Sequence, residues 1–250
     1  MILGIDHIVV GVADLEEAKR EYEGRGFTVV MGGRHLTGTH NMLVSFADGS
    51  YIELIAFYEP NPDHKWWSLL QMGGGLIDVC LQTDDIATDR ANFVAAGMGM
   101  TELTQSGRLR PDGFHIKWQV VSPVDELRGQ VPFLIVDQTP REERVPQETV
   151  HANGATGIGL ITAVLPDLTP VQTYYETALN QTATPLTLPD GTRGIGFTFG
   201  KHPVHFYQAQ SGEMANRLQA RGASWYAAIL AGEGKGKIEL TADTAPEVYL

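Results

Sequence analysis

The stretch IDHIVVGVADL at residues 5–15 decides the fold, because it returns twice further along the chain. It comes back as IDVCLQTDDI at 77–86 and as IGLITAVLPDL at 158–168. In each copy an alternating apolar run ends at an aspartate that can cap a helix, and helical sequence follows. Such self-similarity is typical of a chain built from copies of one supersecondary unit.

The first copy shows what the unit contains. Asp14 is the expected N-cap of a helix in LEEAKREYEGRG, and the glycines of that stretch terminate it. Three β-rich runs follow, namely FTVVMGG, THNMLVSF and SYIELIAFY, and an Asp-Gly hairpin turn joins the last two. The unit therefore consists of a strand, a helix and three strands. We predict an α+β fold of repeated βαβββ modules.

The copies define the expected domain organisation. The first module spans 1–60 and the second 74–138, with strands at GMTELT, HIKWQVV and VPFLIVD and a turn at RLRPDG. The segment 139–155 is polar, contains prolines and has no hydrophobic period, so it is predicted to be a linker, although an arm that wraps the other half is also compatible. Residues 156–250 hold a third module, followed by a degraded fourth module or a cap on the third.

Composition limits the class of protein. The 250 residues are 43% hydrophobic, which is enough for a large core, and the single cysteine excludes an internal disulfide and fits a reducing compartment. No signal stretch or membrane-length apolar run is present. A net charge of −12 argues against a nucleic-acid partner. We expect a cytoplasmic protein with a small-molecule ligand, and the sequence leaves a homodimer open.

Paired βαβββ modules with DH in the first strand and YIEL in the fourth resemble the vicinal oxygen chelate superfamily. That superfamily includes glyoxalase I, extradiol dioxygenases and bleomycin-resistance proteins. The motifs DHIVVGVADL, GGRH, GTHNMLVSFADGSYIELIA, RLRPDG and VPFLIV resemble its glyoxalase-like domain branch. The resemblance implies two modules paired into an incomplete barrel around a cavity, with ligands for a divalent metal on the first and fourth strands.

Strand alternation identifies candidate metal ligands. It places His7 and Glu53 on the inner faces of their strands, opposite the more uniformly apolar faces that helices should cover. Aligning Leu15 with Ile86 lays His7 on Asp78. If the first two modules pair as the resemblance implies, His7, Glu53 and Asp78 converge in one cavity. One imidazole and two carboxylates suit iron, manganese, zinc or magnesium. The plainer reading is a hydrogen-bonded core histidine and a glutamate paired with an arginine.

Departures from the family pattern are visible as well. Phe133 occupies the expected fourth-strand ligand position of the second module, and Asp78 stands where extradiol dioxygenases have a histidine. The third module has Leu160 at the first-strand position, so no metal is expected in the second half. Three further polar residues there are predicted to be surface or interface residues: His202, His205 and Glu239.

Other residues are candidates for substrate binding. Asn41 and Ser45 share the less apolar face of their strand and could line the cavity, and His40 lies at the mouth of that strand. Arg110 lies in a turn that precedes Trp118, and an arginine beside an aromatic ring could hold a planar carboxylate or aromatic ligand. The alternative is a simple Pro-Asp-Gly turn.

Two functions remain compatible with these residues. In the first, the protein is a metal-dependent lyase, isomerase or dioxygenase in which Glu53 or Asp78 moves a proton. In the second, it is a metal-free protein that binds or sequesters a small molecule, as bleomycin-resistance proteins do. The three inward polar residues favour the enzyme, and the missing ligand of the second module favours binding.

Overall fold

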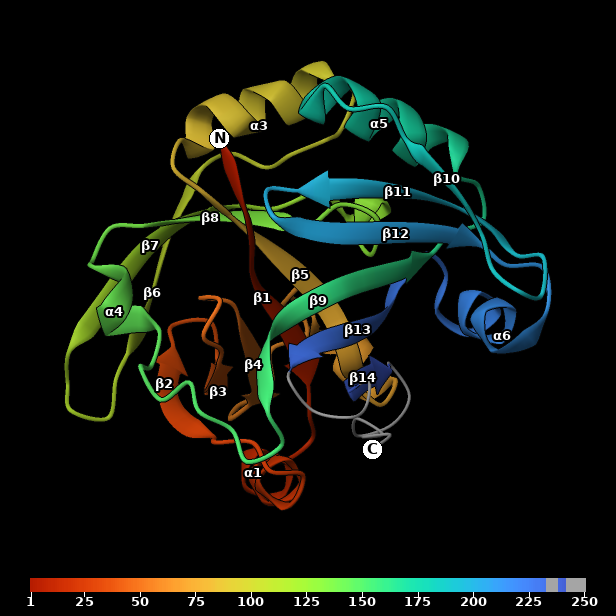
Figure 1. Cartoon of the computed structure of the whole chain (residues 1–250). Coiled ribbons are helices and arrows are strands. Elements are labelled where there is room, and N and C mark those ends of the chain that lie inside the picture. The colour runs from red at the N-terminus through yellow and green to blue at the C-terminus, as the bar shows by residue number, and fades with distance from the viewer. Residues whose placement is uncertain (233–237, 242–250) are drawn as a thin grey trace.

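The computed structural model describes residues 1–232 and 238–241, and its strands form a closed barrel and a separate sheet (Figure 1). Strands of the first two modules build the barrel, in which the order is β1-β4-β3-β2-β6-β7-β8-β5. The predicted α+β fold of paired modules is confirmed. The barrel strands are β1 (Ile2–Gly11), β2 (Val30–His35), β3 (Thr39–Ser45), β4 (Tyr51–Phe57), β5 (Gly75–Thr83), β6 (Thr104–Leu109), β7 (His115–Val121) and β8 (Phe133–Asp137).

The rest of the chain forms a sheet that packs beside the barrel. Its order is β10-β11-β12-β9-β13-β14, and β13 pairs antiparallel with β9 as β5 does with β1. The strands of the sheet are β9 (Ala155–Val164), β10 (Thr184–Thr187), β11 (Arg193–Phe199), β12 (His202–Gln208), β13 (Ser224–Gly232) and β14 (Ile238–Thr241).

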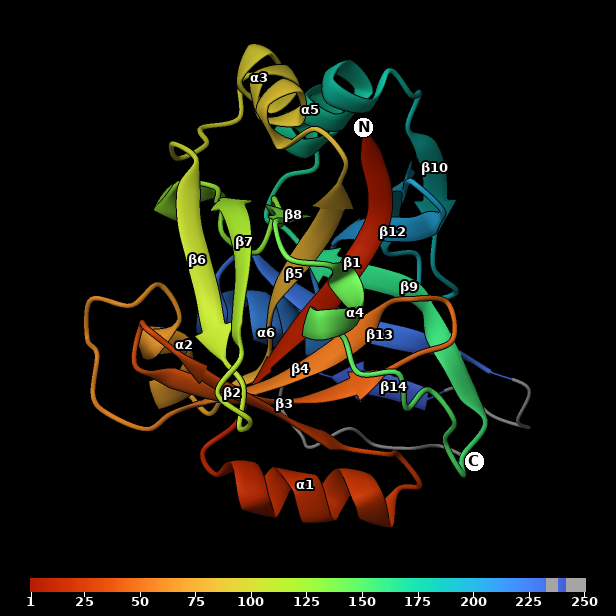
Figure 2. The ribbon, with the colours of Figure 1, turned by 90° about the vertical axis from the view of Figure 1, so that its left-hand side faces the viewer.

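The helices cover the outer faces of these sheets. Helix α1 packs on β3 and β4 at one end of the molecule, whereas α3 and α5 lie side by side at the other end (Figure 2). Asp14 and Asp85 cap α1 and α3 through hydrogen bonds from Glu17 N and Thr88 N. None of the helices that the structure describes could span a membrane. The helices are α1 (Leu15–Gly24), α2 (Trp67–Gln71), α3 (Ile86–Ala95), α4 (Arg141–Arg144), α5 (Thr169–Leu179) and α6 (Gly212–Arg221).

Alternation along the strands separates two hydrophobic regions, as the sequence predicts. Ile8 and Val10 of β1 face the large core that the helices and the second sheet complete. Val9 of β1 and Ile55 of β4 face the barrel interior, together with Trp118 of β7. The interior of the barrel is therefore apolar apart from a group of polar residues at its centre.

The register of the strands agrees with the predicted equivalence of the first two modules. Across β1 and β5, His7 pairs with Cys80 and Val9 pairs with Asp78, and these two pairs are symmetric about the central pair Ile8–Val79. Asp78 is therefore the counterpart of His7, as the alignment predicts. Val9 pairs with Glu53 across β1 and β4, and Cys80 pairs with Phe133 across β5 and β8, so Phe133 is the counterpart of Glu53. The β-bulges keep this symmetry, because the extra residues Asp6 and Ile77 lie at equivalent points of the two strands.

The second module differs in one further detail. Strand β6 begins at Thr104 and not at Gly99, so the run GMTELT belongs mainly to the connection before it. Arg108 consequently lies inside β6, where it pairs with Ile116 of β7. The turn is confined to residues 110–114, and there Arg110 N donates to Phe114 O. Strand alternation, and not turn geometry, therefore sets the direction of the Arg108 side chain.

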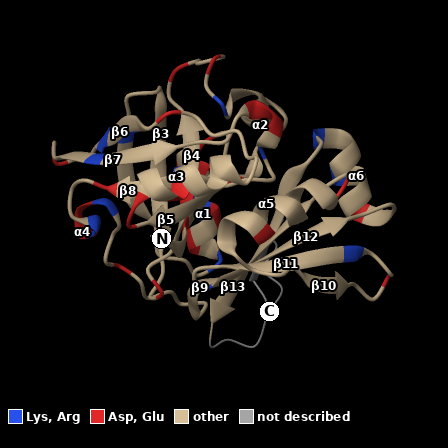
Figure 3. Ribbon diagram, turned by 90° about the horizontal axis from the view of Figure 1, so that it is seen from above, with Lys and Arg blue, Asp and Glu red and all other residues tan. Residues whose placement is uncertain are grey.

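The segment between the halves is an arm that packs against the barrel. Helix α4 lies next to the end of β8, where Figure 3 shows its basic residues beside acidic ones. Arg144 of this helix is buried and reaches Asp6 and Asp137. Residues 139–155 could have been a free linker or an arm that wraps the other half, and in the structure they form an arm.

The second sheet contacts the barrel through His202. This imidazole accepts a hydrogen bond from Ile5 N at Nδ1, and its Nε2 lies 3.3 Å from Asp48 Oδ2. It packs over Gly4, where a Cβ would lie 2.7 Å from the ring. His202 is therefore an interface residue, as predicted. The side chain of Glu239 lies outside the described residues.

Candidate functional site

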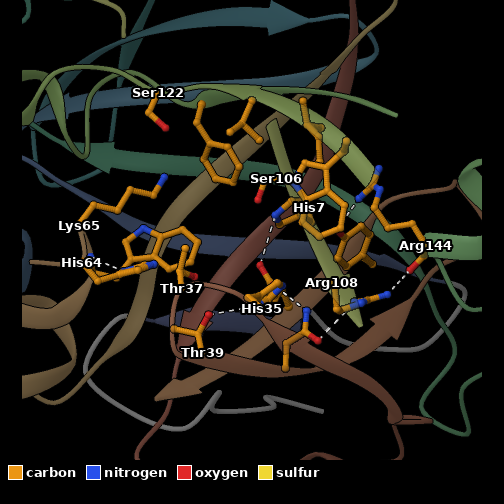
Figure 4. A pocket seen from close by; sticks show the side chains of 18 residues that line it. His7, His35, Thr37, Thr39, His64, Lys65, Ser106, Arg108, Ser122 and Arg144 are labelled. Atoms are coloured by element: carbon orange, nitrogen blue, oxygen red, sulfur yellow. Dashed lines mark hydrogen bonds and ion pairs between the residues drawn. The ribbon is translucent and has the colours of Figure 1, made fainter. Parts of the chain in front are cut away.

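The barrel encloses a cavity of about 190 Å³. Figure 4 shows its lining, in which histidines and cationic side chains lie among aromatic rings. Strands of both modules and the segment before α2 contribute to it. The lining residues that carry the chemistry are His7, His35, Asn41, Glu53, His64, Lys65, Arg108 and Arg144, and those that form the aromatic wall are Tyr51, Trp66, Trp118 and Phe133.

His7 and Glu53 meet at the centre of this cavity. His7 Nε2 lies 3.5 Å from Glu53 Oε2, and both side chains are at least nine-tenths buried. They come together because β1 and β4 are parallel neighbours in which Val9 pairs with Glu53, so that His7 lies diagonally opposite the carboxylate. The ring of His7 stacks on Tyr51 with 4.6 Å between centroids. Two of the three predicted metal ligands are thus adjacent.

A buried carboxylate fixes the orientation of His7. Asp6 Oδ1 lies 2.6 Å from His7 Nδ1, and Arg144 donates to both oxygens of Asp6. Arg141 binds the same carboxylate. Burial opposes ionisation of Asp6, but the charge of Arg144 and the hydrogen bonds to His7 and Arg144 lower its pKa well below the usual value. Asp6 therefore remains a carboxylate, and Nε2 of His7 is directed toward Glu53.

Glu53 remains ionised because other groups surround it. Burial raises the pKa of a carboxyl group, but the hydrogen bond and charge of His7, together with His35 and Asn41, lower the pKa of Glu53 to about 2. Asn41 Nδ2 donates to Oε1 at 2.5 Å, and His35 Nε2 lies 3.7 Å from the same oxygen. Between two carboxylates, His7 has a raised pKa despite its burial. The position between Asp6 and Glu53 therefore attracts positive charge.

His35 is a third imidazole beside this pair. Its Nδ1 lies 2.9 Å from Thr39 Oγ1, so that Nε2 faces Glu53. Burial lowers the pKa of His35 to about 4, which keeps the ring neutral at physiological pH. A neutral imidazole with one nitrogen fixed by a neighbour is the form in which histidine binds metals.

The donor set can be compared with the needs of a divalent metal. Ligand atoms about 2.0–2.2 Å from one tetrahedral ion lie about 3.4 Å apart, close to the 3.5 Å that separates His7 Nε2 from Glu53 Oε2. In the described part of the chain, only Asp6, His7 and Cys80 form a trio with all donor atoms within 4.8 Å of one another. That trio is blocked, since Asp6 is bound by arginines and burial raises the pKa of Cys80 well above its ordinary value. His7 and Glu53 fit a metal, and His35 is the nearest further donor to Glu53.

Asp78, the third predicted ligand, is not part of the cavity lining. Its Oδ2 accepts hydrogen bonds from Lys65 Nζ at 3.0 Å and from Trp66 Nε1 at 2.8 Å. Lys65 and Trp66 themselves line the cavity, so they lie between Asp78 and its interior. The prediction that Asp78 converges with His7 and Glu53 is therefore wrong in geometry, because a segment between the modules covers the carboxylate.

The structure divides the predicted substrate-binding residues into two groups. Asn41 and Trp118 line the cavity. Ser45 shares the face of Asn41 but lies outside the lining, beyond the cluster of Leu43, Tyr51 and Val145. His40 points to the outer side, where its ring contacts Tyr58.

Arg110 also lies outside the cavity, because the turn carries it to the surface. It binds Asp112 and Glu143, which lie beside it. Arg108, two residues earlier in β6, points inward and is 4% exposed. The structure therefore contradicts the choice of Arg110, and the arginine of β6 that lines the cavity with Trp118 is Arg108.

Several residues of the site carried no signal in the sequence. Arg144 belongs to a polar segment without periodicity, and Lys65 belongs to the connection between the modules. Simple alternation along β1 would place Asp6 on the face opposite His7, but a bulge lies between Ile5 and His7, and Asp6 binds Arg144. His35 was detectable only as part of the motif GGRH.

A paired-module barrel with a polar centre defines the class of the protein, and comparisons with known proteins define its family. Residues 5–179 match the family described as "Glyoxalase-like domain". The chain belongs to this family, and the resemblance to the vicinal oxygen chelate superfamily is confirmed. No curated protein matches the sequence.

Solved structures share the fold at low sequence identity. A hypothetical protein from Staphylococcus aureus has a TM-score of 0.70 at 15% identity, with 94% of both chains covered. A xylose isomerase-like TIM barrel/4-hydroxyphenylpyruvate dioxygenase fusion protein has a TM-score of 0.59 at 14% identity, covering 94% of this chain and 37% of the other. A mutant 4-hydroxymandelate synthase from Streptomyces coelicolor has a TM-score of 0.59 at 14% identity, covering 90% of this chain and 69% of the other. These similarities concern the fold.

Proposed function

We propose that this protein is a divalent-metal-dependent enzyme that acts on a small oxygen-bearing substrate in the barrel cavity. The observation that carries the proposal is the His7–Glu53 pair, whose imidazole is oriented by a buried, ion-paired Asp6. A carboxylate behind the second nitrogen of a histidine is the usual support of a metal-ligating imidazole. The structural similarity to a 4-hydroxyphenylpyruvate dioxygenase fusion protein and the family match support testing a metal-assisted lyase, isomerase or dioxygenase reaction.

His7 and Glu53 would hold the ion, and His35 is the nearest additional donor. A divalent ion at this position would polarise a substrate oxygen as a Lewis acid. The low pKa of Glu53 favours a ligand over a general base, because an efficient base has a pKa near the working pH. Arg144 acts as a positioning residue in this scheme, because it fixes Asp6 and through it His7.

The apolar wall would exclude water from the reacting centre. Trp118, Phe133 and Ile135 line the cavity together with the polar residues, and all three are at least nine-tenths buried. Electrostatic interactions are stronger in such a dry environment than in water. Asp78 has no direct role in this scheme, because Lys65 and Trp66 bind it.

A metal-free binding protein is the second candidate, and one observation favours it. Glu53 Oε1 already accepts a hydrogen bond from Asn41, and Oε2 faces His7, so the carboxylate is satisfied without an ion. In that reading the proton on His7 supplies the positive charge between Asp6 and Glu53. The cavity would then bind its ligand without changing it.

Elemental analysis of protein purified without chelator separates the two functions. The proposal expects about one divalent ion per chain, lost in His7→Ala and Glu53→Gln. His40→Ala is the matched control and should keep the ion, because His40 is a partly exposed residue of the same module on the outer side of the barrel. Absence of a stoichiometric ion after reconstitution with iron, manganese, zinc and magnesium would rule out the metal enzyme and favour the binding protein.

A further inference from the structure

Resting on the proposed use of the cavity, we infer that its ligand carries a carboxylate that pairs with Arg108. The guanidinium of Arg108 lies in the cavity wall and is 4% exposed. Its hydrogen bonds go to uncharged groups, with Nη1 donating to Asn41 Oδ1 at 3.3 Å and Nη2 to Arg144 O at 2.8 Å. Its Nε has no hydrogen-bond partner in the described structure.

The other charged groups around the cavity are already matched. Arg144 pairs with Asp6, Lys65 pairs with Asp78, and His7 faces Glu53. None of the described carboxylates forms an ion pair with Arg108. Burying a charge without a partner costs several kcal/mol, so buried charges in proteins are normally paired. An anionic ligand group would supply the missing charge.

The remainder of the cavity indicates what the carboxylate is attached to. The cavity that Arg108 lines also has apolar wall residues, namely Trp118, Phe133 and Ile135. A protein cavity of about 150 Å³ holds one benzene ring. The volume of about 190 Å³ here therefore suits one aromatic ring with a short carboxylate side chain.

Carboxylate recognition by arginine fits better than recognition of a larger anion. A guanidinium presents parallel N–H donors that match the two oxygens of a carboxylate. Glu53 also lines the cavity and is ionised, so a dianion would be repelled more strongly than a monoanion. The ligand class is therefore an aromatic monocarboxylate.

Calorimetric titration with three probes tests this assignment: phenylacetate, the neutral phenylacetamide and phenyl phosphate. Charged hydrogen bonds contribute roughly 1.5–3 kcal/mol, so phenylacetate should bind about 10- to 100-fold more tightly than phenylacetamide. Arg108→Met should abolish that difference, whereas Arg110→Met, a change two residues away on the surface, should preserve it. Equal binding of acid and amide by the natural protein, tighter binding of phenyl phosphate, or no binding at millimolar concentration would each overturn the inference.

A second measurement keeps the test independent of the variant and of the metal. Phenylacetate should raise the unfolding temperature of the natural protein and phenylacetamide should not; a rise of the same size with both would contradict the inference. Titrations run with and without chelator separate it from the proposed function. A preference for phenylacetate that persists in metal-free protein supports the carboxylate site even if the proposed metal enzyme is ruled out. A bound metal without a preference for phenylacetate would support the metal enzyme and contradict the carboxylate site.

Discussion

His7 of the first module and Cys80 of the second lie opposite each other across the antiparallel pair of β1 and β5. One module places there an imidazole that a buried carboxylate orients. The other places a thiol whose pKa is raised well above its ordinary value by burial. The polar chemistry of the barrel is therefore concentrated in the first module, and the second supplies mainly apolar wall and Arg108.

The Cys80 thiol should be unreactive in the folded protein. It is fully buried, and the thiolate that reacts with alkylating or disulfide reagents is disfavoured there. Because it is the only cysteine, labelling reports one site. We expect the labelling rate with a thiol reagent to equal the unfolding rate and to rise with denaturant. Rapid labelling in native buffer, at the rate of a free thiol, would contradict the structure.

The Arg144–Asp6 ion pair should be important for stability. Both side chains are almost completely buried, and removing one partner leaves an uncompensated charge, which costs about 3–5 kcal/mol. Arg144→Met should therefore lower the free energy of unfolding by that amount in urea denaturation. Arg90→Met breaks the exposed pair with Glu102 and should cost less than about 1 kcal/mol. Similar losses in the two variants would argue against a role for the buried pair.

Gly32 should be essential for the arrangement of the polar centre. A Cβ at this position would lie 2.1 Å from Asn41 Oδ1 and 2.8 Å from Arg108 Nη1. Gly32→Ala should displace both side chains, lower stability by about 1–3 kcal/mol and weaken ligand binding in the cavity. Gly24→Ala is the control, since nothing lies within 4 Å of the added methyl group. Unchanged stability and binding in Gly32→Ala would show that the cavity wall tolerates rearrangement.

The contact between barrel and second sheet should weaken in acid. Burial opposes ionisation of Asp48, but hydrogen bonds from His202 and Ser50 lower its pKa from 3.8 to about 2. A lowered pKa in the folded state contributes stability that is present above about pH 4 and is lost as the pH falls toward 2. Asp48→Asn should therefore be less stable than the natural protein at pH 7, with a difference that shrinks below pH 4. A difference independent of pH in urea denaturation would exclude this contribution.

The sequence predicts the modules and part of the site because both depend on strand alternation. Inward-facing positions of β1, β3, β4 and β7 follow from a period of two, and they place His7, Asn41, Glu53 and Trp118 at the cavity. Asp78 is missing from the cavity for a reason that strand alternation cannot predict. Lys65 and Trp66, which belong to the connection between the modules, bind and cover its carboxylate.

The remaining site residues come from outside the repeat. Arg144 and Lys65 lie in segments whose sequence has no hydrophobic period, so their position depends on tertiary contacts alone. Arg108 was assigned to a turn because of the proline and glycine that follow it, whereas the hairpin extends far enough to include it in β6. The Arg108 side chain points into the cavity because its pair with Ile116 continues the strand alternation of β6.

The position of Arg144 also has a consequence for the order in which this protein is made. Asp6 is synthesised well before its buried counter-charge, which is supplied by a residue 138 positions later, after both barrel modules have been made. Until α4 docks, a barrel formed from residues 1–137 would enclose an unpaired carboxylate and an imidazole without its fixed orientation. The cavity therefore reaches its final arrangement only after α4 has bound to the barrel.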